Sequence, residues 1–131
     1  MDSQRVVVAI TGASGSIYGI RTLQFLNAME DIETHLVITS SARSTIGIET
    51  SFGSSEVETL ADHVHGFRDI GASIASGSFL TKGMIVAPCS IKSLSAIANS
   101  FGADLVSRAA DVTLKERRPL VLMVRETPFH L

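Results

Sequence analysis

Four short apolar runs constrain the fold of this chain more than any other feature. Each has the length of a β-strand and lacks a clean alternation of apolar and polar positions: residues 5–10, 33–39, 83–87 and 119–125. Segments with a helical spacing of apolar residues separate these runs. Strands of this kind, alternating with helices, are typical of a parallel sheet that is covered on both faces. The sequence therefore predicts an α/β fold, a three-layer, doubly wound parallel sheet.

The segments between the apolar runs complete this alternation. Their spacing predicts four longer helices, at residues 17–29, 41–49, 91–99 and 103–115. Ser55 and Glu58 match a capping box that would open a short helix reaching Val64. Residues 67–82 have weak periodicity, and we expect a loop there with room for one short strand. The 131 residues are enough for one domain with its own core.

A turn of small residues, TGASGSIYG from Thr11 to Gly19, ends the first apolar run. A helical pattern begins directly behind it. Such a junction directs backbone N–H groups and the positive end of a helix dipole at one spot, which suits a phosphate. An ordinary strand-to-helix turn, with Gly at positive φ and Ser as the cap, explains the same residues. Because the glycine spacing matches neither G-x-G-x-x-G nor the P-loop, the turn alone leaves both interpretations open.

Ligands of doubly wound folds bind outside the carboxyl ends of the strands, near the point where the strand order reverses. Glycines, hydroxyls and one pair of opposite charges follow the apolar runs: Gly12 to Gly15, Thr39, Pro88-Cys89-Ser90 and Arg125-Glu126-Thr127. We interpret Cys89 as a small buried hydrophobic residue rather than a nucleophile. His63 and His65 lack a third neighbouring ligand, so no metal site is predicted, and both are expected to be solvated loop residues.

Composition excludes several classes of function. A formal charge of −2 and a pI near 6 provide no broad positive field, so nucleic acid is not an expected partner. No apolar run approaches the ~20 residues of a membrane span, and the first run behaves as a strand rather than a signal segment. A single cysteine, Cys89, cannot form an internal disulfide, which favours a reducing, cytoplasmic location.

Six short motifs occur together in this chain, and in that order they resemble the UbiX-like flavin prenyltransferases. The motifs are residues 12–15 with 18–19, 75–78, 88–90, 108–112, 114–118 and 125–128. The family is also described as phenolic-acid or polyprenyl-hydroxybenzoate decarboxylases, flavoprotein subunit. The resemblance runs from Val6 to the last residue and implies a Rossmann-like, flavodoxin-like sheet. Cysteine decarboxylases that use FMN share this fold, but the Lys-Glu-Arg-Arg and Arg-Glu-Thr-Pro blocks look like the prenyltransferase branch.

The resemblance implies that the chain binds reduced FMN and converts it, with dimethylallyl phosphate, into prenylated FMN without a metal. A UbiD-type decarboxylase would accept the product. Thr39 replaces the Ser that the family usually has there, and the hydroxyl is kept. The cofactor-binding residues that the resemblance implies are Gly12, Ala13, Ser14, Gly15, Thr39, Ser76, Ser90, Ile91, Lys92, Ser93, Arg108 and Arg125.

Four residues match the catalytic positions of the family. Cleavage of the allylic C–O bond places negative charge on phosphate, which fixed cations stabilise, and Lys115, with Arg125, matches that role. Ring closure needs proton transfer by a carboxylate, and Glu49 and Glu126 match those positions, with Ser14 as a relay. Without the resemblance, a solvated cluster at a helix end explains Lys115 equally well. Arg108 could likewise be a surface charge.

The family also predicts how the chain assembles. Its members form trimers that associate into dodecamers, with each flavin site completed by neighbouring subunits and Glu49 reaching across. They continue past residues 125–128 with a helix, a strand and a C-terminal helix. We therefore expect residues 1–131 to form a single flavoprotein domain that lacks these elements, with one sheet edge and one face exposed. A non-catalytic FMN carrier and a direct FMN-dependent aromatic-acid decarboxylase stay open as alternative functions.

Overall fold

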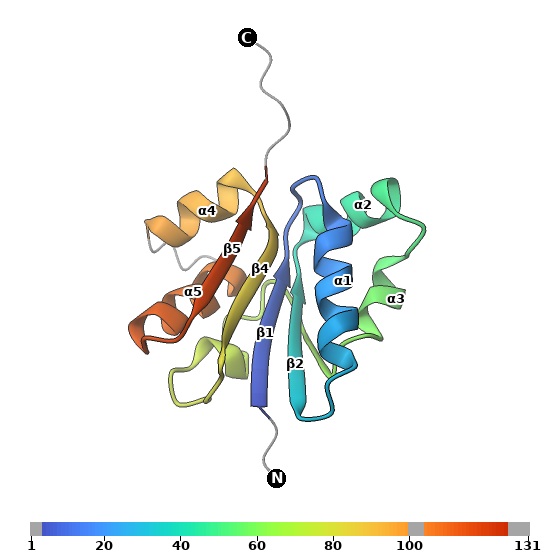
Figure 1. Ribbon diagram of the computed structural model, residues 1–131. Helices are drawn as coiled ribbons and strands as arrows, with labels where there is room; N and C mark the ends of the chain where they lie inside the picture. Colours follow the sequence, from blue (N-terminus) through green and yellow to red (C-terminus); the bar gives the residue numbers. More distant parts are fainter. Residues whose placement is uncertain (1–3, 100–103, 126–131) are drawn as a thin grey trace.

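A five-stranded parallel sheet forms the centre of the molecule (Figure 1). The computed structural model describes residues 4–99 and 104–125. The strand order is β3-β2-β1-β4-β5, so the order reverses between β1 and β4. This arrangement confirms the predicted doubly wound α/β fold. The strands are β1 (Gln4–Ile10), β2 (Ile32–Ile38), β3 (His63–His65), β4 (Gly83–Cys89) and β5 (Leu120–Val124).

Helices cover both faces of the sheet, which explains the continuous apolar runs. Val8 and Ile10 of β1 pack on one face, while Val7 and Ala9 pack on the other, because successive strand residues point to opposite sides. Figure 1 shows the resulting three layers. The helical elements are α1 (Ser16–Asn27), α2 (Ser40–Glu49), α3 (Ser54–Glu58), the 3-10 turn Ser73–Ala75, α4 (Ile91–Ala98) and α5 (Leu105–Lys115).

The segment between α2 and β4 differs from its prediction. Helix α3 begins one residue early, at Ser54, and the N–H of Gly53 donates to Glu56 Oε1 at 3.2 Å, so the predicted capping box of Ser55 and Glu58 is wrong. The helix ends at Glu58, and His63–His65 forms the edge strand β3 instead of a helix end or a solvated loop. No strand forms within residues 67–82, all of which the structure describes.

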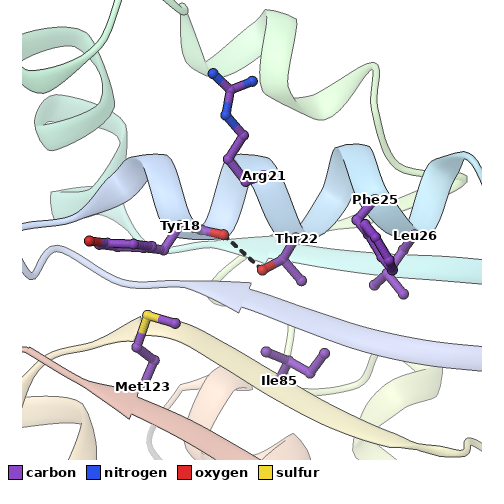
Figure 2. Close-up of a pocket in the computed structure, with 7 residues that line it drawn as sticks. All are labelled: Tyr18, Arg21, Thr22, Phe25, Leu26, Ile85 and Met123. Carbon is purple, nitrogen blue, oxygen red and sulfur yellow. Dashed lines mark hydrogen bonds between the residues drawn. The ribbon is translucent and has the colours of Figure 1, made fainter.

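The sheet face on which α1 packs is open to solvent at strand β5. Val121 and Met123 of β5 point to this side, and they are 56% and 37% exposed. A groove of about 500 Å³ lies between α1 and the strands β4 and β5. Figure 2 shows its lining, which is Tyr18, Arg21, Thr22, Phe25, Leu26, Ile85 and Met123. No helix among the described residues is long and apolar enough to cross a membrane.

Candidate functional site

Thr11 joins the carboxyl ends of the central strands. Its buried hydroxyl donates to the carbonyl of Pro88 at 2.7 Å and accepts from the N–H of Ser90 at 2.9 Å. The N–H of Thr39 donates to the carbonyl of Ile10 at 3.1 Å, which adds the end of β2. Sequence reasoning missed this role of Thr11, although a polar residue directly after a buried strand was the signal. The hydroxyl fixes the strand ends where the strand order reverses.

The first turn is occupied by a carboxylate of the same chain. Gly15 has φ 108°, a left-handed conformation that favours glycine. Glu49, the last residue of α2, accepts hydrogen bonds through Oε1 from the N–H groups of Gly15 (3.0 Å) and Ser16 (3.1 Å). This contact lies within the chain, and the expected reach of Glu49 into a neighbouring subunit stays a prediction. The donors predicted to face a phosphate here therefore already bind an anion.

These contacts change the acidity of Glu49. The hydrogen bond from the backbone of Gly15 is the main reason why the pKa of this carboxyl lies below its ordinary value. Burial opposes the shift, while Ser14 and Ser16 add to it. Glu49 is therefore ionised at neutral pH, next to Ser14 and in front of the amino end of α1.

Gly12 is required by the packing of α2 against the turn. A methyl group at this position would overlap the side chain of Ser41, whose Cβ would lie 2.7 Å away. Thr45 donates its hydroxyl to the carbonyl of Gly12 at 3.3 Å. Glycine at position 12 therefore allows α2 to pack closely against the first turn. Ala13, the next residue of the turn, is almost fully buried.

Helices α2 and α4 also begin at the carboxyl ends of the strands, called the carboxyl edge below, and each has a hydroxyl cap. Thr39 Oγ1 accepts from the N–H of Ala42 at 3.2 Å at the start of α2. Ser90 Oγ accepts from the N–H of Ser93 at 3.1 Å at the start of α4, where Ile91 and Lys92 are exposed. Each cap satisfies one of the N–H groups that a helix leaves free at its amino end. The remaining donors suit the phosphate of a nucleotide, so the residues at this edge fit FMN.

Arg125 adds a cation beside the first turn. The backbone N–H of Arg125 donates to the carbonyl of Cys89 at 3.0 Å, and its guanidinium lies 5.0 Å from the centroid of the Tyr18 ring. Its Nε would lie 3.3 Å from a Cβ added at Gly15. Cys89 is fully buried, as expected of a small hydrophobic side chain, and this burial raises the pKa of its thiol. Glu126, Thr127 and Pro128 lie outside the described residues.

Three predicted site residues lie away from the carboxyl ends of the strands or, within residues 4–99 and 104–125, make no contact with the site there. Lys115 ends α5 just before β5 begins, at the amino ends of the strands, and pairs with Asp111 at 3.0 Å. Ser76 belongs to a loop that Arg118 holds through the carbonyls of Gly77 and Phe79, also at the amino ends. Arg108 is exposed on α5. Helix α5 connects the parallel strands β4 and β5, so it runs from their carboxyl ends back to their amino ends. Its last residues are therefore far from the first turn of the same chain.

Comparisons with known proteins agree with this fold and site. Residues 1–129 match the family model "Flavoprotein". Flavin prenyltransferase UbiX from Escherichia coli K12 is 60% identical over 128 residues, which are 98% of this chain and 68% of the relative. A crystal structure of AnUbiX (PadA1) in complex with FMN and dimethylallyl pyrophosphate superposes with a TM-score of 0.94, at 52% identity over 98% of this chain and 68% of that one.

A second solved structure superposes with the same TM-score. It is a dodecameric FMN-dependent UbiX-like decarboxylase from Escherichia coli O157:H7, with a TM-score of 0.94 and 47% identity over 97% of this chain and 69% of that chain. The fold and the carboxyl-edge site thus define a flavoprotein of the doubly wound class. Within that class, the chain belongs to the UbiX-like family of flavin prenyltransferases.

Proposed function

We propose that this chain joins a dimethylallyl group from dimethylallyl phosphate to reduced FMN and releases prenylated FMN. The observation that carries this function is the 60% identity to a flavin prenyltransferase across 98% of the chain. The bound flavin would supply the nucleophilic atoms, N5 and then C6. The protein's part is to bind the two phosphates, exclude water and move protons.

The FMN phosphate binds at the amino ends of α2 and α4 in this proposal. At the amino end of α1, Glu49 already accepts from the N–H groups of Gly15 and Ser16, and its negative charge would repel a phosphate. The other two helix starts carry Thr39 and the run Ser90 to Ser93, with hydroxyls and exposed Lys92. The backbone of residues 12–15 then lies beside the flavin ring rather than the phosphate.

Arg125, Ser14 and Glu49 contribute the chemistry that the chain itself provides at this edge. The guanidinium of Arg125 stabilises the charge that develops on the leaving phosphate. Glu49 is ionised and is therefore ready to accept a proton, with the hydroxyl of Ser14 as a relay. Glu126 follows Arg125 directly and is the second proposed acid–base group, outside the described residues.

The positions of Ser76, Arg108 and Lys115 favour an assembly in which these residues complete the site of a neighbouring copy. We propose a homo-oligomer built on threefold contacts, up to a dodecamer. Support comes from the placement of Lys115 at the opposite edge of its own sheet and from the dodecameric relative. We also propose that residues 1–131 form a single domain and that the protein is located in the cytoplasm. A UbiD-type decarboxylase would accept the product.

Mass spectrometry of the flavin tests this function directly. The chain is incubated without oxygen with reduced FMN and dimethylallyl phosphate, and the flavin is then extracted. A gain of one C5 unit supports prenyl transfer. Unchanged FMN that co-purifies with the protein would instead identify a carrier, and carbon dioxide released from an aromatic acid without a second protein would identify a decarboxylase.

A further inference from the structure

Glu33 and three histidines form a cluster on β2 and β3, away from the flavin site. His35 of β2 and His63 of β3 are register partners, and Glu33 precedes His35 by two residues, so the three side chains share one face of the sheet. Glu33 Oε1 lies 2.8 Å from His35 Nε2 and 3.1 Å from His63 Nε2. The ring of His35 stacks on that of His63 at a centroid distance of 4.6 Å, and its Nδ1 faces the Nε2 of His65.

We propose that Glu33, His35 and His63 bind a divalent transition-metal ion of the zinc class. Their ligand atoms all lie within 4.8 Å of one another. Tetrahedral zinc with bonds of about 2.0–2.2 Å needs ligand atoms roughly 3.4 Å apart. To admit an ion, Glu33 would move away from both rings, and the exposed ring of His63 would rotate out of its stack on His35. Two imidazole nitrogens and a carboxylate oxygen are ligands that zinc, cobalt and nickel accept, unlike the all-oxygen sets of magnesium and calcium.

His65 is the positioning residue of this site. Its Nε2 lies 2.9 Å from Nδ1 of His35, the nitrogen that does not face Glu33. A metal on His35 Nε2 requires the proton of the neutral ring to sit on Nδ1, and His65 Nε2 can then accept it as a hydrogen bond. Phe79 meets the His35 ring edge-on at a centroid distance of 5.1 Å, which further fixes its plane. Metal-binding histidines commonly have such a partner.

The surroundings leave the carboxylate available and the site accessible. Arg5 Nε lies 3.9 Å from Glu33 Oε1, farther than either histidine, and its guanidinium rests 4.1 Å over the ring of Phe79. A carboxylate has about four lone-pair positions, so Arg5 does not exhaust them. His35 is buried while the side chain of His63 is 54% exposed, which provides a path for the ion and one open coordination position for water.

Such an ion would join the edge strand to the sheet. β3 has only three residues and pairs with β2 alone among the described strands. Two ligands come from β2 and one from β3, so the metal would cross-link the two strands. Binding to the folded chain alone would raise the melting temperature with metal concentration. The metal site lies away from the proposed flavin site at the carboxyl edge. A test can therefore refute metal binding without refuting prenyl transfer, and the reverse.

Cobalt binding to the tag-free chain tests the proposal. Co²⁺ bound by nitrogen ligands absorbs visible light, so a titration should reach a plateau at one ion per chain, and Zn²⁺ should remove the signal. His63→Gln, an exposed substitution, should weaken Co²⁺ binding by more than about tenfold, and His65→Gln by about 10–100-fold. His130→Gln, the same change at the fourth histidine of the sequence, is the matched control and should bind as the unmodified chain does.

Two further measurements make the outcome decisive. Far-UV circular dichroism shows whether each variant folds, and Glu33→Gln replaces any histidine variant that does not. Hydrogen exchange with Zn²⁺ should slow at the amides of β3 in the unmodified chain and not in His63→Gln. No cobalt signal from the unmodified chain at millimolar metal, or equal affinities for His63→Gln and His130→Gln, would overturn the proposal.

Discussion

The two ends of the sheet are built from different kinds of residues. At the carboxyl edge, short hydroxyls and backbone groups that directly follow a strand meet one another, as Thr11, Thr39 and Ser90 do. At the amino ends of the strands, called the amino edge here, long charged and aromatic side chains from distant segments meet, as Arg5, Phe79 and Arg118 do. Strand topology is enough to place the first set at one end of the sheet. The second set also depends on strand register and loop path, and this difference predicts separate effects of substitution.

Arg125→Ala should produce the largest effect, and it should be confined to chemistry. Loss of one group that stabilises developing charge typically costs about 10²–10³ in kcat. The side chain is exposed, so the melting temperature should change little. Single-turnover flavin spectra together with a melting curve measure both quantities. Arg21→Ala is the matched control, since Arg21 is exposed on α1 and its side chain donates a hydrogen bond to Gln24 of the same helix.

An Arg125→Ala variant with normal single-turnover rates would show that the carboxyl edge of the chain does not bind the leaving phosphate. A variant that melts early would instead assign Arg125 to the contact with Tyr18.

The carboxyl edge could be predicted from the sequence because its residues follow buried strands at known positions. Parallel strands end together, so Gly12, Thr39 and Ser90 had to meet once a parallel sheet was recognised. The contact between Glu49 and the first turn could not be predicted, because it depends on where the last turn of α2 lies over the start of α1. A pattern of residue types contains no such distance.

The amino edge was predicted poorly for two physical reasons. β3 has three residues, too few for periodicity to indicate a strand, so His63 was assigned to a loop and its proximity to His35 was missed. Lys115 was grouped with Arg125 because both match one family site. The direction of the helix between two parallel strands already places the end of α5 at the amino edge, and this argument was available from the sequence.

Thr11→Val should lower stability most among the substitutions that keep the chain folded. It replaces the hydroxyl by a methyl group of similar shape, removes the buried hydrogen bond to the carbonyl of Pro88 and leaves the partly buried N–H of Ser90 without its acceptor. Loss of these two hydrogen bonds should cost about 1–3 kcal/mol. FMN affinity should fall as well, because Ser90 caps α4. Denaturant unfolding measures the free energy. Thr22→Val, which removes a hydroxyl from the exposed side of α1, should change it by less than about 0.5 kcal/mol.

Arg118→Ala tests the amino edge in the same way. Its guanidinium donates to the carbonyls of Gly77 (2.9 Å) and Phe79 (3.2 Å) and is partly buried. Loss of both bonds should cost about 1–2 kcal/mol and raise hydrogen exchange in residues 76–80. Arg117→Gly is the contrasting variant, because Arg117 has φ 56° and glycine adopts that conformation without strain. Equal destabilisation by both variants would contradict the role of the Arg118 contacts.

The smallest expected effect is the pH dependence that Glu49 contributes. Its pKa is lowered in the folded chain, so its contribution to stability is present above the unfolded value of about 4.5 and is lost as the pH falls through the folded value. Because the side chain is exposed, solvent screens the contribution. Unfolding free energies measured from pH 6 to pH 3 should therefore decline less steeply for Glu49→Gln than for the unmodified chain. Glu30→Gln, an exposed change before β2, should retain the full slope, and identical slopes for both variants would mean that Glu49 leaves the turn in solution.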